Sequence, residues 1–535
     1  MAGRGGENAF QYRRAAKPLL GVGRRCANCC AWLRGFAAAG RARHNGGCVC
    51  RAAVRSFAAS LAPMSSSVDK SLQPLLWLVA VGLFMQTLDS TIVNTALPAM
   101  ARSLSESPLK MQSVIIAYTL TTAMLMPASG WLADRFGTRR MFFAAIFLFT
   151  VGSLLCAESR SLTMLIASRV VQGVGGALLM PVGRLTVLRV VPREQFLPAM
   201  SFVTIPGLIG PLIGPTLGGW LVEAVSWHWI FLINIPVGVI GALVTLKIMP
   251  DVYAENGDGF DWTGYAMLAF GMAAVSFSLD GLSELGFKHA TVLVLLIFGL
   301  AALTAYWLHA GRVAGPLFPR SLFAVPSFSI GILGNLFARI GSGGMPFLIP
   351  LLLQVSLGYT PLQAGLMMVP VAAAGMAAKP VGTWAIKRYG YRRMLFGNTL
   401  MVGLMMASFA LVTPEWPLWL RIVQLAVFGT FNSMQFTAMN TLTLKDLSGP
   451  HASSGNSMLS MVMMLSMSLG VAAAGALLTG FTDFAGAGEA HDTLGAFHKT
   501  FICVGLITAA AAWIFAQLST SESTQAAKHA GLEAE

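Results

Sequence analysis

Charge is scarce in this sequence. Only 11% of its 535 residues are Asp, Glu, Lys or Arg, whereas soluble proteins contain about a quarter. Apolar runs take the place of the missing charge, and 55% of the residues are hydrophobic. Since a helix of about 20 apolar residues crosses the hydrocarbon core of a bilayer, the composition excludes an ordinary soluble protein and indicates a multi-pass membrane protein.

Catalytic and nucleotide-binding motifs are also absent. The sequence contains no G-x-x-x-x-G-K-[ST], no H-E-x-x-H and no G-x-S-x-G, the patterns of phosphate loops, zinc proteases and serine hydrolases. We therefore expect no enzyme, no ATP-driven pump and no metal site in the membrane-spanning part. A non-transporting membrane sensor is the alternative from another class, but no loop is long enough to hold a soluble signalling domain.

Residues 1–63 differ from the rest of the chain. They contain eleven Lys or Arg, one acid (Glu7) and five of the seven cysteines. We interpret them as a basic leader that is disordered or that precedes the true start at Met64. A transit peptide, which is also Arg-rich and acid-poor, and a zinc site at the C-x2-C-C and C-x-C spacings are the alternatives.

Fourteen apolar segments follow the leader. Because hydrocarbon offers no partners to backbone N–H and C=O groups, each segment must be helical, and the alternation typical of a barrel is sparse. We therefore predict an all-α membrane protein with 14 transmembrane helices. The segments cover residues 75–97, 112–133, 141–158, 162–184, 196–222, 227–249, 262–281, 289–309, 328–353, 362–386, 394–412, 417–441, 455–479 and 497–518.

A basic loop pattern occurs twice, eight segments apart. DRFGTRRM (134–141) returns as KRYGYRRM (387–394), and chance similarity between two basic loops is the alternative explanation. Repeated halves are common in secondary transporters. Because Lys and Arg favour cytoplasmic loops, their distribution predicts that both termini are cytoplasmic. The predicted parts are a six-helix bundle at 64–249, an inserted helix pair at 250–326, a second six-helix bundle at 327–518 and a tail at 519–535.

Asp89 is the one acid well inside an apolar segment. A charge at bilayer depth is costly and marks a functional hypothesis whose partner should be named. A rise of 1.5 Å per residue places Asp89 and Arg169 at similar depths, roughly 10–12 Å from the outer edge. Burial favours the neutral carboxyl group and a nearby arginine favours the carboxylate, so a change of surroundings would bind and release a proton. A structural ion pair is the alternative.

Glycines recur at spacings of three and four between residues 207 and 219. Such glycines form a smooth helix face that lets a neighbouring helix approach closely. Pro211 and Pro215 interrupt the helical hydrogen bonds and permit bending, so static packing and a moving hinge are both consistent with the pattern. The face consists of Gly207, Gly210, Gly214 and Gly218.

The first basic loop lies within GWLADRFGTRR, residues 130–140. We expect Gly130 to permit close packing and Gly137 to permit a tight turn. Asp134 is expected at a helix C-terminus, where the helix dipole repels it, so it should seek an arginine or another helix N-terminus. A purely topological arginine cluster is the alternative. The arginines expected to face the anionic leaflet are Arg135, Arg139 and Arg140.

Cations without acids distinguish the second half of the chain. Arg339 is predicted near mid-depth and Lys379 roughly 10 Å from the cytoplasmic face. This charge argues for an anionic or zwitterionic substrate, such as an organic acid or a carboxylate-bearing metal chelate. Snorkelling of Lys379 to the interface and bonding between helices by the amides are the alternatives. The candidate substrate site is Arg339, Lys379, Asn432 and Gln435.

Four motifs occur in order along the first half: LDSTIVNTALP (88–98), GWLADRFGTRR (130–140), RVVQGVGGA (169–177) and GLIGPLIGPTLGG (207–219). Together they resemble the major facilitator superfamily, specifically its fourteen-helix drug:proton antiporter-2 group. The resemblance implies a proton-coupled antiporter that exports small molecules or drugs across the bacterial inner membrane by alternating access. An exporter of organic anions or metal chelates is the competing interpretation.

The resemblance also implies roles for particular residues. Asp134 would latch the halves together on the cytoplasmic side. If the protein is proton-coupled, as the resemblance implies, the depth argument makes Asp89, with Arg169 beside it, the leading carrier of the proton. The second loop carries Lys387 where the first carries Asp134, so a symmetrical latch is not expected. The helix-four motif contributes Gln172, Gly173 and Gly176, and the antiporter motif contributes Gly207, Gly210, Pro211, Gly214, Pro215, Gly218 and Gly219. The implied partners are substrate, protons and lipid, without a cofactor or nucleic acid. A monomer is compatible with these partners. The resemblance does not specify an efflux partner protein.

Overall fold

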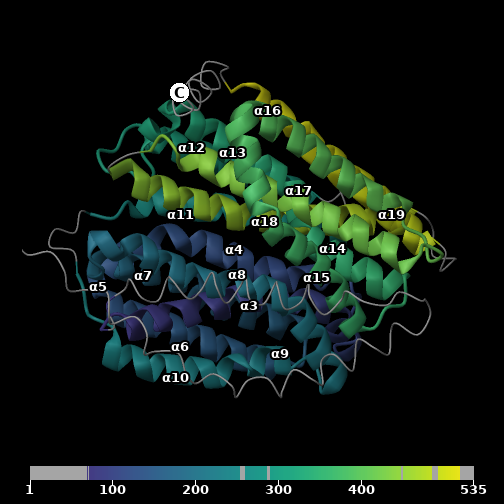
Figure 1. Cartoon of the computed structure of the whole chain (residues 1–535), viewed down its shortest axis with the longest axis horizontal. Coiled ribbons are helices and arrows are strands. Elements are labelled where there is room, and N and C mark those ends of the chain that lie inside the picture. The colour runs from purple at the N-terminus through teal and green to yellow at the C-terminus, as the bar shows by residue number, and fades with distance from the viewer. Residues whose placement is uncertain are drawn as a thin grey trace, which may run out of the picture. The chain divides into compact units, whose positions relative to one another are not determined.

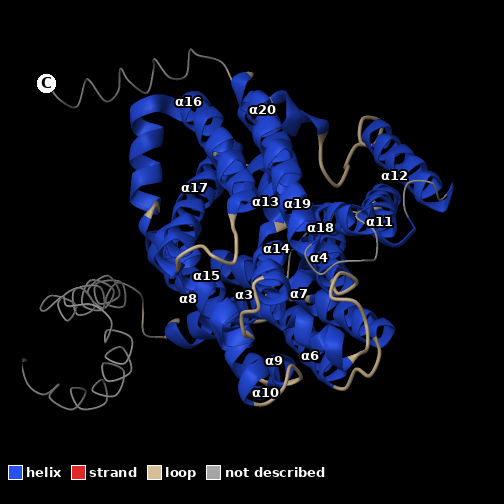
Figure 2. Ribbon diagram, turned by 90° about the vertical axis from the view of Figure 1, so that its right-hand side faces the viewer, coloured by secondary structure: helices blue, strands red, loops and turns tan. Residues whose placement is uncertain are grey.

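Helices make up all the regular structure in the described part of the chain (Figure 2). The predictions for the leader at 1–63 and the tail at 519–535 lie outside that part. All the described residues belong to one unit. The computed structural model describes residue 69 and residues 71–253, 259–285, 290–447, 450–484 and 492–518.

Each of the fourteen predicted apolar segments coincides with helix. Among the described residues, twelve helices are long and apolar enough to cross a membrane. Two segments fall outside that set: α15 (Pro361–Ala377) has only 17 residues, and α17 (Leu418–Leu444) carries Arg421 and several amides. The prediction of an all-α membrane fold is therefore confirmed.

The helices before the inserted pair are called the N-terminal half, and those after it the C-terminal half. The N-terminal half comprises α3 (Gln73–Ser103), α4 (Gln112–Leu125), α5 (Ser129–Phe136), α6 (Thr138–Ala157), α7 (Leu162–Val190), α8 (Arg193–Ala224), α9 (Trp229–Leu232) and α10 (Asn234–Ile248). The inserted pair is α11 (Trp262–Leu285) and α12 (Ala290–His309). The C-terminal half comprises α13 (Pro326–Gly343), α14 (Met345–Leu351), α15, α16 (Lys379–Ser408), α17, α18 (Pro450–Phe484), α19 (Asp492–Ala510) and α20 (Ala512–Ala516).

Several predicted continuous helices are divided in the structure, and two of those in the C-terminal half divide beside a proline. The segment at 328–353 divides at Gly344 into α13 and α14, which continues into a short π-helix. The segment at 362–386 divides at Ala378 into α15 and the first part of α16. In both cases a proline, Pro346 or Pro380, stands near the start of the second helix, where its missing N–H removes a bond to the preceding turn.

The repeated basic loop has the same backbone geometry in both copies. Gly137, between α5 and α6, has φ 89° and ψ 148°, and Gly390 has φ 74° and ψ 164°. This region is almost restricted to glycine. Gly390 bends α16 sharply (Figure 2). The part of α16 before the bend is the end of the tenth predicted segment, and the part after the bend is the eleventh. The likeness of the two loops therefore extends from sequence to conformation.

The two halves lie side by side along their helices. In Figure 1 the purple-to-teal helices of the N-terminal half occupy the lower part and the green-to-yellow helices of the C-terminal half the upper part. Helix α8 packs against α15, and α4 packs against α18. From the inserted pair, α11 contacts both α4 and α18. The interfaces between the halves hold the cavities described below.

Candidate functional site

Asp89 of α3 is completely buried beside Arg169 of α7. The Nη1 atom of Arg169 donates a hydrogen bond of 2.7 Å to Oδ2 of Asp89, and the exposed fractions of the two side chains are 1% and 0%. Because hydrocarbon and protein surround this depth, neither charge is solvated by bulk water. The residue count predicted similar depths for the two charges, and the structure brings them into direct contact. Their role in proton coupling stays a prediction.

Two amides hold the other carboxylate oxygen. Gln172 Nε2 donates to Asp89 Oδ1 over 2.8 Å, and Asn234 Nδ2, at the start of α10, donates to the same atom over 3.3 Å. Ser153 of α6 accepts from both amides. The carboxylate is thus an acceptor for donors from α7 and α10. Sequence reasoning missed Ser153 and Asn234, because neither residue lies in one of the four motifs.

The guanidinium of Arg169 is enclosed on its other sides. Its Nε atom donates to the carbonyl of Val114 over 3.3 Å. Its Cζ atom lies 4.3 Å from the ring centre of Tyr118 and 5.8 Å from that of Phe231. Aromatic faces attract a cation, so α4 and α9 complete a closed environment for the charge pair.

Glycines of the helix-four motif bring α7 close to α4. A methyl group at Gly176 would lie 2.6 Å from the hydroxyl oxygen of Tyr118, and one at Gly173 would lie 2.9 Å from Cβ of Thr121. Real side chains do not approach this closely, so both positions require glycine. The close approach places Arg169 against Tyr118 and Val114 of α4.

The antiporter motif packs α8 against α3. A methyl group at Gly210 would lie 2.8 Å from the backbone nitrogen of Leu88, and one at Gly218 would lie 2.5 Å from the carbonyl oxygen of Ile92. Gly207 and Gly214 continue this face against Leu83 and Thr91. The smooth glycine face that the spacing predicted is therefore present, and α3, which carries Asp89, is the helix that it contacts.

Contacts between the halves close one end of the molecule. This is the end opposite the two basic loops. A methyl group at Gly219 would lie 2.2 Å from the carbonyl oxygen of Pro361, so α8 and α15 touch through their backbones. Gln354 Nε2 donates to the carbonyl of Thr95 over 3.0 Å, and Thr216 Oγ1 donates to the carbonyl of Gly365 over 3.2 Å. These contacts are called the seal.

A cavity lies between the halves on the loop side of the seal. Its empty volume is about 1080 Å³, including its open mouth. Thr91 and Asn94 of α3 line it from the N-terminal half, and Asn432 and Phe436 of α17 line it from the C-terminal half. Lys379 is the one charged side chain among its described lining residues. Pro211 and Pro215 also line this central cavity.

The candidate substrate site is only partly brought together. Lys379 and Asn432 line the central cavity, but Gln435 is wrong as a lining residue. Its side chain is buried, where it donates to Thr399 Oγ1 over 2.8 Å and accepts from Asn398. Gln435 therefore bonds between α17 and α16, on the side of α17 away from the cavity.

Arg339 stands behind the cavity wall. Its Nε atom donates to Oδ1 of Asn335 over 3.0 Å, and its guanidinium lies 4.3 Å from the ring centre of Phe436. Phe436 itself lines the cavity. Arg339 is not among the described lining residues, and its guanidinium packs against Phe436, which is one of them.

The predictions for the basic loop of the N-terminal half are confirmed at two residues and wrong at a third. Asp134 accepts a hydrogen bond from Arg189 of α7, so the predicted arginine partner is confirmed, although it belongs to the same half. Gly137 forms the predicted tight turn. Gly130 was predicted to permit close packing, which is wrong, because no atom lies within 4 Å of a methyl group placed there.

The loop arginines differ in exposure. Arg135 and Arg140 are exposed, as expected for residues facing an anionic leaflet. Arg139 instead donates through Nε to the carbonyl of Met249. It therefore ties the loop to the end of α10.

A cavity between two helical halves, sealed at one end, is the arrangement of a secondary membrane transporter. The sequence narrows this class further. The chain belongs to the Major Facilitator Superfamily, whose family model matches residues 79–471 and, in a second match, 331–533.

Curated bacterial relatives cover nearly the same region. A protein of Pectobacterium atrosepticum named as multidrug resistance protein MdtD is 54% identical over 440 residues, which is 82% of this chain and 94% of that protein. Proteins of the same name from Yersinia enterocolitica and Serratia proteamaculans are 53% and 52% identical. These span 84% and 85% of this chain and 96% and 95% of the relatives.

Solved structures share the fold at low sequence identity. A bacterial homolog of the human lysosomal transporter Spinster, in an inward-facing and unoccupied conformation, has a TM-score of 0.59 at 15% identity, covering 86% of this chain and 98% of that one. The human organic anion transporter MFSD10 has a TM-score of 0.55 at 12% identity, covering 84% and 100%.

Proposed function

We propose that this transporter is a proton-coupled antiporter that exports small molecules from the bacterial cytoplasm by alternating access. Cargo leaves chemically unchanged, and the proton gradient supplies the energy without a cofactor. The observation that carries the proposal is the position of Asp89. It is a buried carboxylate on α3, the helix that also contributes Thr91 and Asn94 to the central cavity.

Proton binding at Asp89 would change the contacts of α3. A protonated carboxyl group loses its charge and turns one oxygen from an acceptor into a donor. Its attraction to Arg169 and its bonds from Gln172 and Asn234 then weaken. Helix α3 also contributes the carbonyl of Thr95 to the seal. A shift of α3 against α7 would therefore reach both the cavity and the seal, and this is the coupling that we propose.

The proposed orientation places both termini and the two basic loops in the cytoplasm. The central cavity lies on the loop side of the seal, so the described conformation is ready to receive cargo from the cytoplasm. Opening of the seal would release cargo on the other side. Asp134 and the glycines of α8 would then act in the latch and the hinge, with lipid and protons as partners.

The cargo has two candidate classes. The relatives' name supports drugs as cargo. The second candidate is an organic anion or carboxylate-bearing chelate, and the charge of the central cavity favours it: Lys379 is the sole charged residue among the described lining, with no acid to attract a cationic drug. Neutral drugs suit the apolar lining equally well.

A proton-exchange assay on the full chain separates these candidates. Proteoliposomes with a pH-sensitive dye inside and an imposed proton gradient receive cationic drugs, neutral drugs and organic acids with and without iron. We expect proton movement on adding cargo. A response to drugs alone would support drugs as cargo. A response to acids or chelates alone would support the second class, provided that it falls at least tenfold in Lys379→Gln and is unchanged in the surface variant Lys110→Gln. No proton movement with any compound contradicts both.

A further inference from the structure

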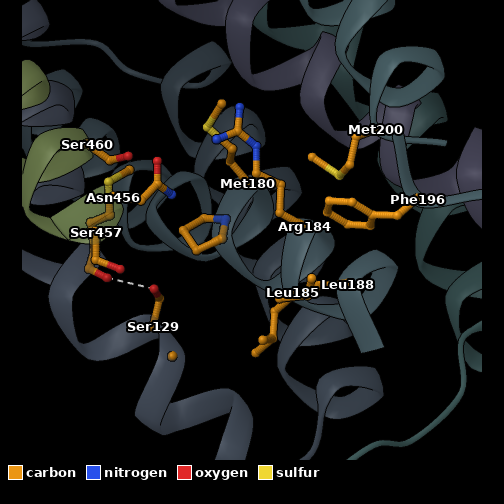
Figure 3. Close-up of a pocket in the computed structure, with 13 residues that line it drawn as sticks. Ser129, Met180, Arg184, Leu185, Leu188, Phe196, Met200, Asn456, Ser457 and Ser460 are labelled. Carbon is orange, nitrogen blue, oxygen red and sulfur yellow. Dashed lines mark hydrogen bonds between the residues drawn. The ribbon is translucent and has the colours of Figure 1, made fainter. Parts of the chain in front are cut away.

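A second cavity lies between the halves nearer the basic loops. It has an empty volume of about 1030 Å³, including its mouth. Helices α7 and α8 form one wall and α18 forms the other (Figure 3). This loop-side cavity is distinct from the central cavity, and the two share none of their described lining residues.

Arg184 is the one charged side chain among the described lining residues of the loop-side cavity. It projects from α7 into the cavity (Figure 3). Its Nε atom is buried and has no hydrogen-bond partner, and no described acid forms an ion pair with it. A buried guanidinium nitrogen without an acceptor is costly. An anion in the cavity would supply that acceptor.

The other walls suit an amphipathic molecule. Asn456, Ser457 and Ser460 of α18 offer amide and hydroxyl groups opposite Arg184 (Figure 3). Met200 and Phe196 of α8 add a thioether and an aromatic ring beside it. Thioethers adapt their shape to varied apolar ligands. One charged donor, neutral polar groups and an apolar wall together match a carboxylate attached to an apolar body.

We propose that the loop-side cavity is a binding site for amphipathic organic carboxylates, held by Arg184. That such a ligand is cargo on its way to Lys379 rests on the proposed function. The binding itself does not depend on it. Arginine suits this task because its planar fork pairs with both oxygens of a carboxylate.

Equilibrium binding to the full chain in a neutral detergent tests the site. The probe is the fluorescent fatty carboxylate dansylaminoundecanoate, and its carboxamide is the matched neutral probe. We expect Arg184→Gln to weaken carboxylate binding by about tenfold, the effect of losing a charge-assisted hydrogen bond, without changing carboxamide binding. Arg184→Lys keeps the charge but lacks the planar fork, so it should restore only part of the affinity. Arg102→Gln, an exposed arginine at the sealed end, is the control.

Three outcomes overturn the assignment. The first is equal carboxylate affinity in wild type and Arg184→Gln. The second is loss of binding in Lys379→Gln alone, which would place the ligand in the central cavity. The third is displacement of the probe by phosphatidylglycerol at lower concentration than by the free carboxylate, which would make the site one for lipid headgroups. The binding assay uses no proton gradient, so it tests the site independently of transport. If Arg184→Gln weakens carboxylate binding but no compound moves protons in liposomes, the proposed function is contradicted and the binding site is supported.

Discussion

At the residue scale, the charge pair in the N-terminal half is the feature that most needs explaining. Asp89 and Arg169 are both withdrawn from water. The free energy needed to desolvate two charges exceeds the stabilisation that an ion pair at the protein surface provides. Hydrogen bonds from Gln172 and Asn234 and the ring of Tyr118 offset part of that cost. An apolar pair would pack at lower cost, so retention of the charges points to a use for the proton.

The pair gives a stability prediction. Arg169→Gln leaves the buried carboxylate without its counter-charge and should cost about 3–5 kcal/mol. Adding Asp89→Asn removes that carboxylate and should recover most of the loss. Melting temperatures of the purified variants in detergent measure this, with Arg102→Gln as the control. A double variant no more stable than Arg169→Gln would show that the two charges are not energetically coupled.

Counting residues from segment ends was enough to find this pair, because two helices starting at one membrane face place residues at predictable depths. It did not find Ser153 or Asn234, since their convergence on Asp89 depends on how α6 and α10 pack. Gln435 was misplaced for a related reason. The sequence places Gln435 within α17, but the position of a residue along a helix does not determine which side of that helix faces the cavity.

At the element scale, α8 is one of the helices that contact both halves. Its glycine face lies on α3, and Gly219 meets Pro361 of α15. Four prolines interrupt its hydrogen bonds without ending the helix. The spacing of the glycines predicted a smooth face, and the contacts identify α3 as the neighbour. Whether the helix bends during transport stays a prediction.

Gly218→Ala tests this packing. The added methyl group would lie 2.5 Å from the carbonyl oxygen of Ile92, so α3 and α8 must separate, at a cost of about 1–3 kcal/mol. We expect a lower melting temperature and slower transport. Gly397→Ala is the matched control, because no atom lies within 4 Å of its methyl group. Equal melting temperatures for the two variants would contradict close packing of α3 and α8.

The inserted pair has its own ionisable contact. Asp261 precedes α11, accepts from the N–H of Gly264 over 2.8 Å and pairs with His309 at the end of α12. Burial opposes ionisation, yet the bonds from Gly264 and His309 hold the pKa of Asp261 below its ordinary value. A lowered folded-state pKa means that the stabilisation is present above the unfolded pKa and disappears as the pH falls through the folded one.

Asp261→Ala should therefore destabilise the protein at neutral pH by about 1 kcal/mol, the usual value of a capping side chain. The difference in melting temperature from wild type should shrink as the pH falls below about 4, the ordinary value for aspartate. Asp446→Ala, at an exposed acid, should show little difference at either pH. A difference for Asp261→Ala that grows on acidification would contradict the sign of the shift.

At the scale of the whole molecule, the two halves share a loop conformation but differ in the charges that they carry inside the membrane-spanning part. The loops at Gly137 and Gly390 share a conformation, while the N-terminal half holds the ion pair and the C-terminal half contributes Lys379 to the central cavity. Composition and segment length predicted the helical membrane fold. The seal was beyond sequence reasoning, because it depends on contacts between residues such as Thr95 and Gln354 that belong to different halves.

The most direct test of proton coupling compares two transport modes of Asp89→Asn in one set of proteoliposomes. Exchange of labelled for unlabelled cargo needs the conformational change but no net proton movement, whereas gradient-driven accumulation needs both. We predict that Asp89→Asn keeps exchange and loses accumulation, and that Asp446→Asn keeps both. Normal gradient-driven accumulation by Asp89→Asn would show that another group carries the proton.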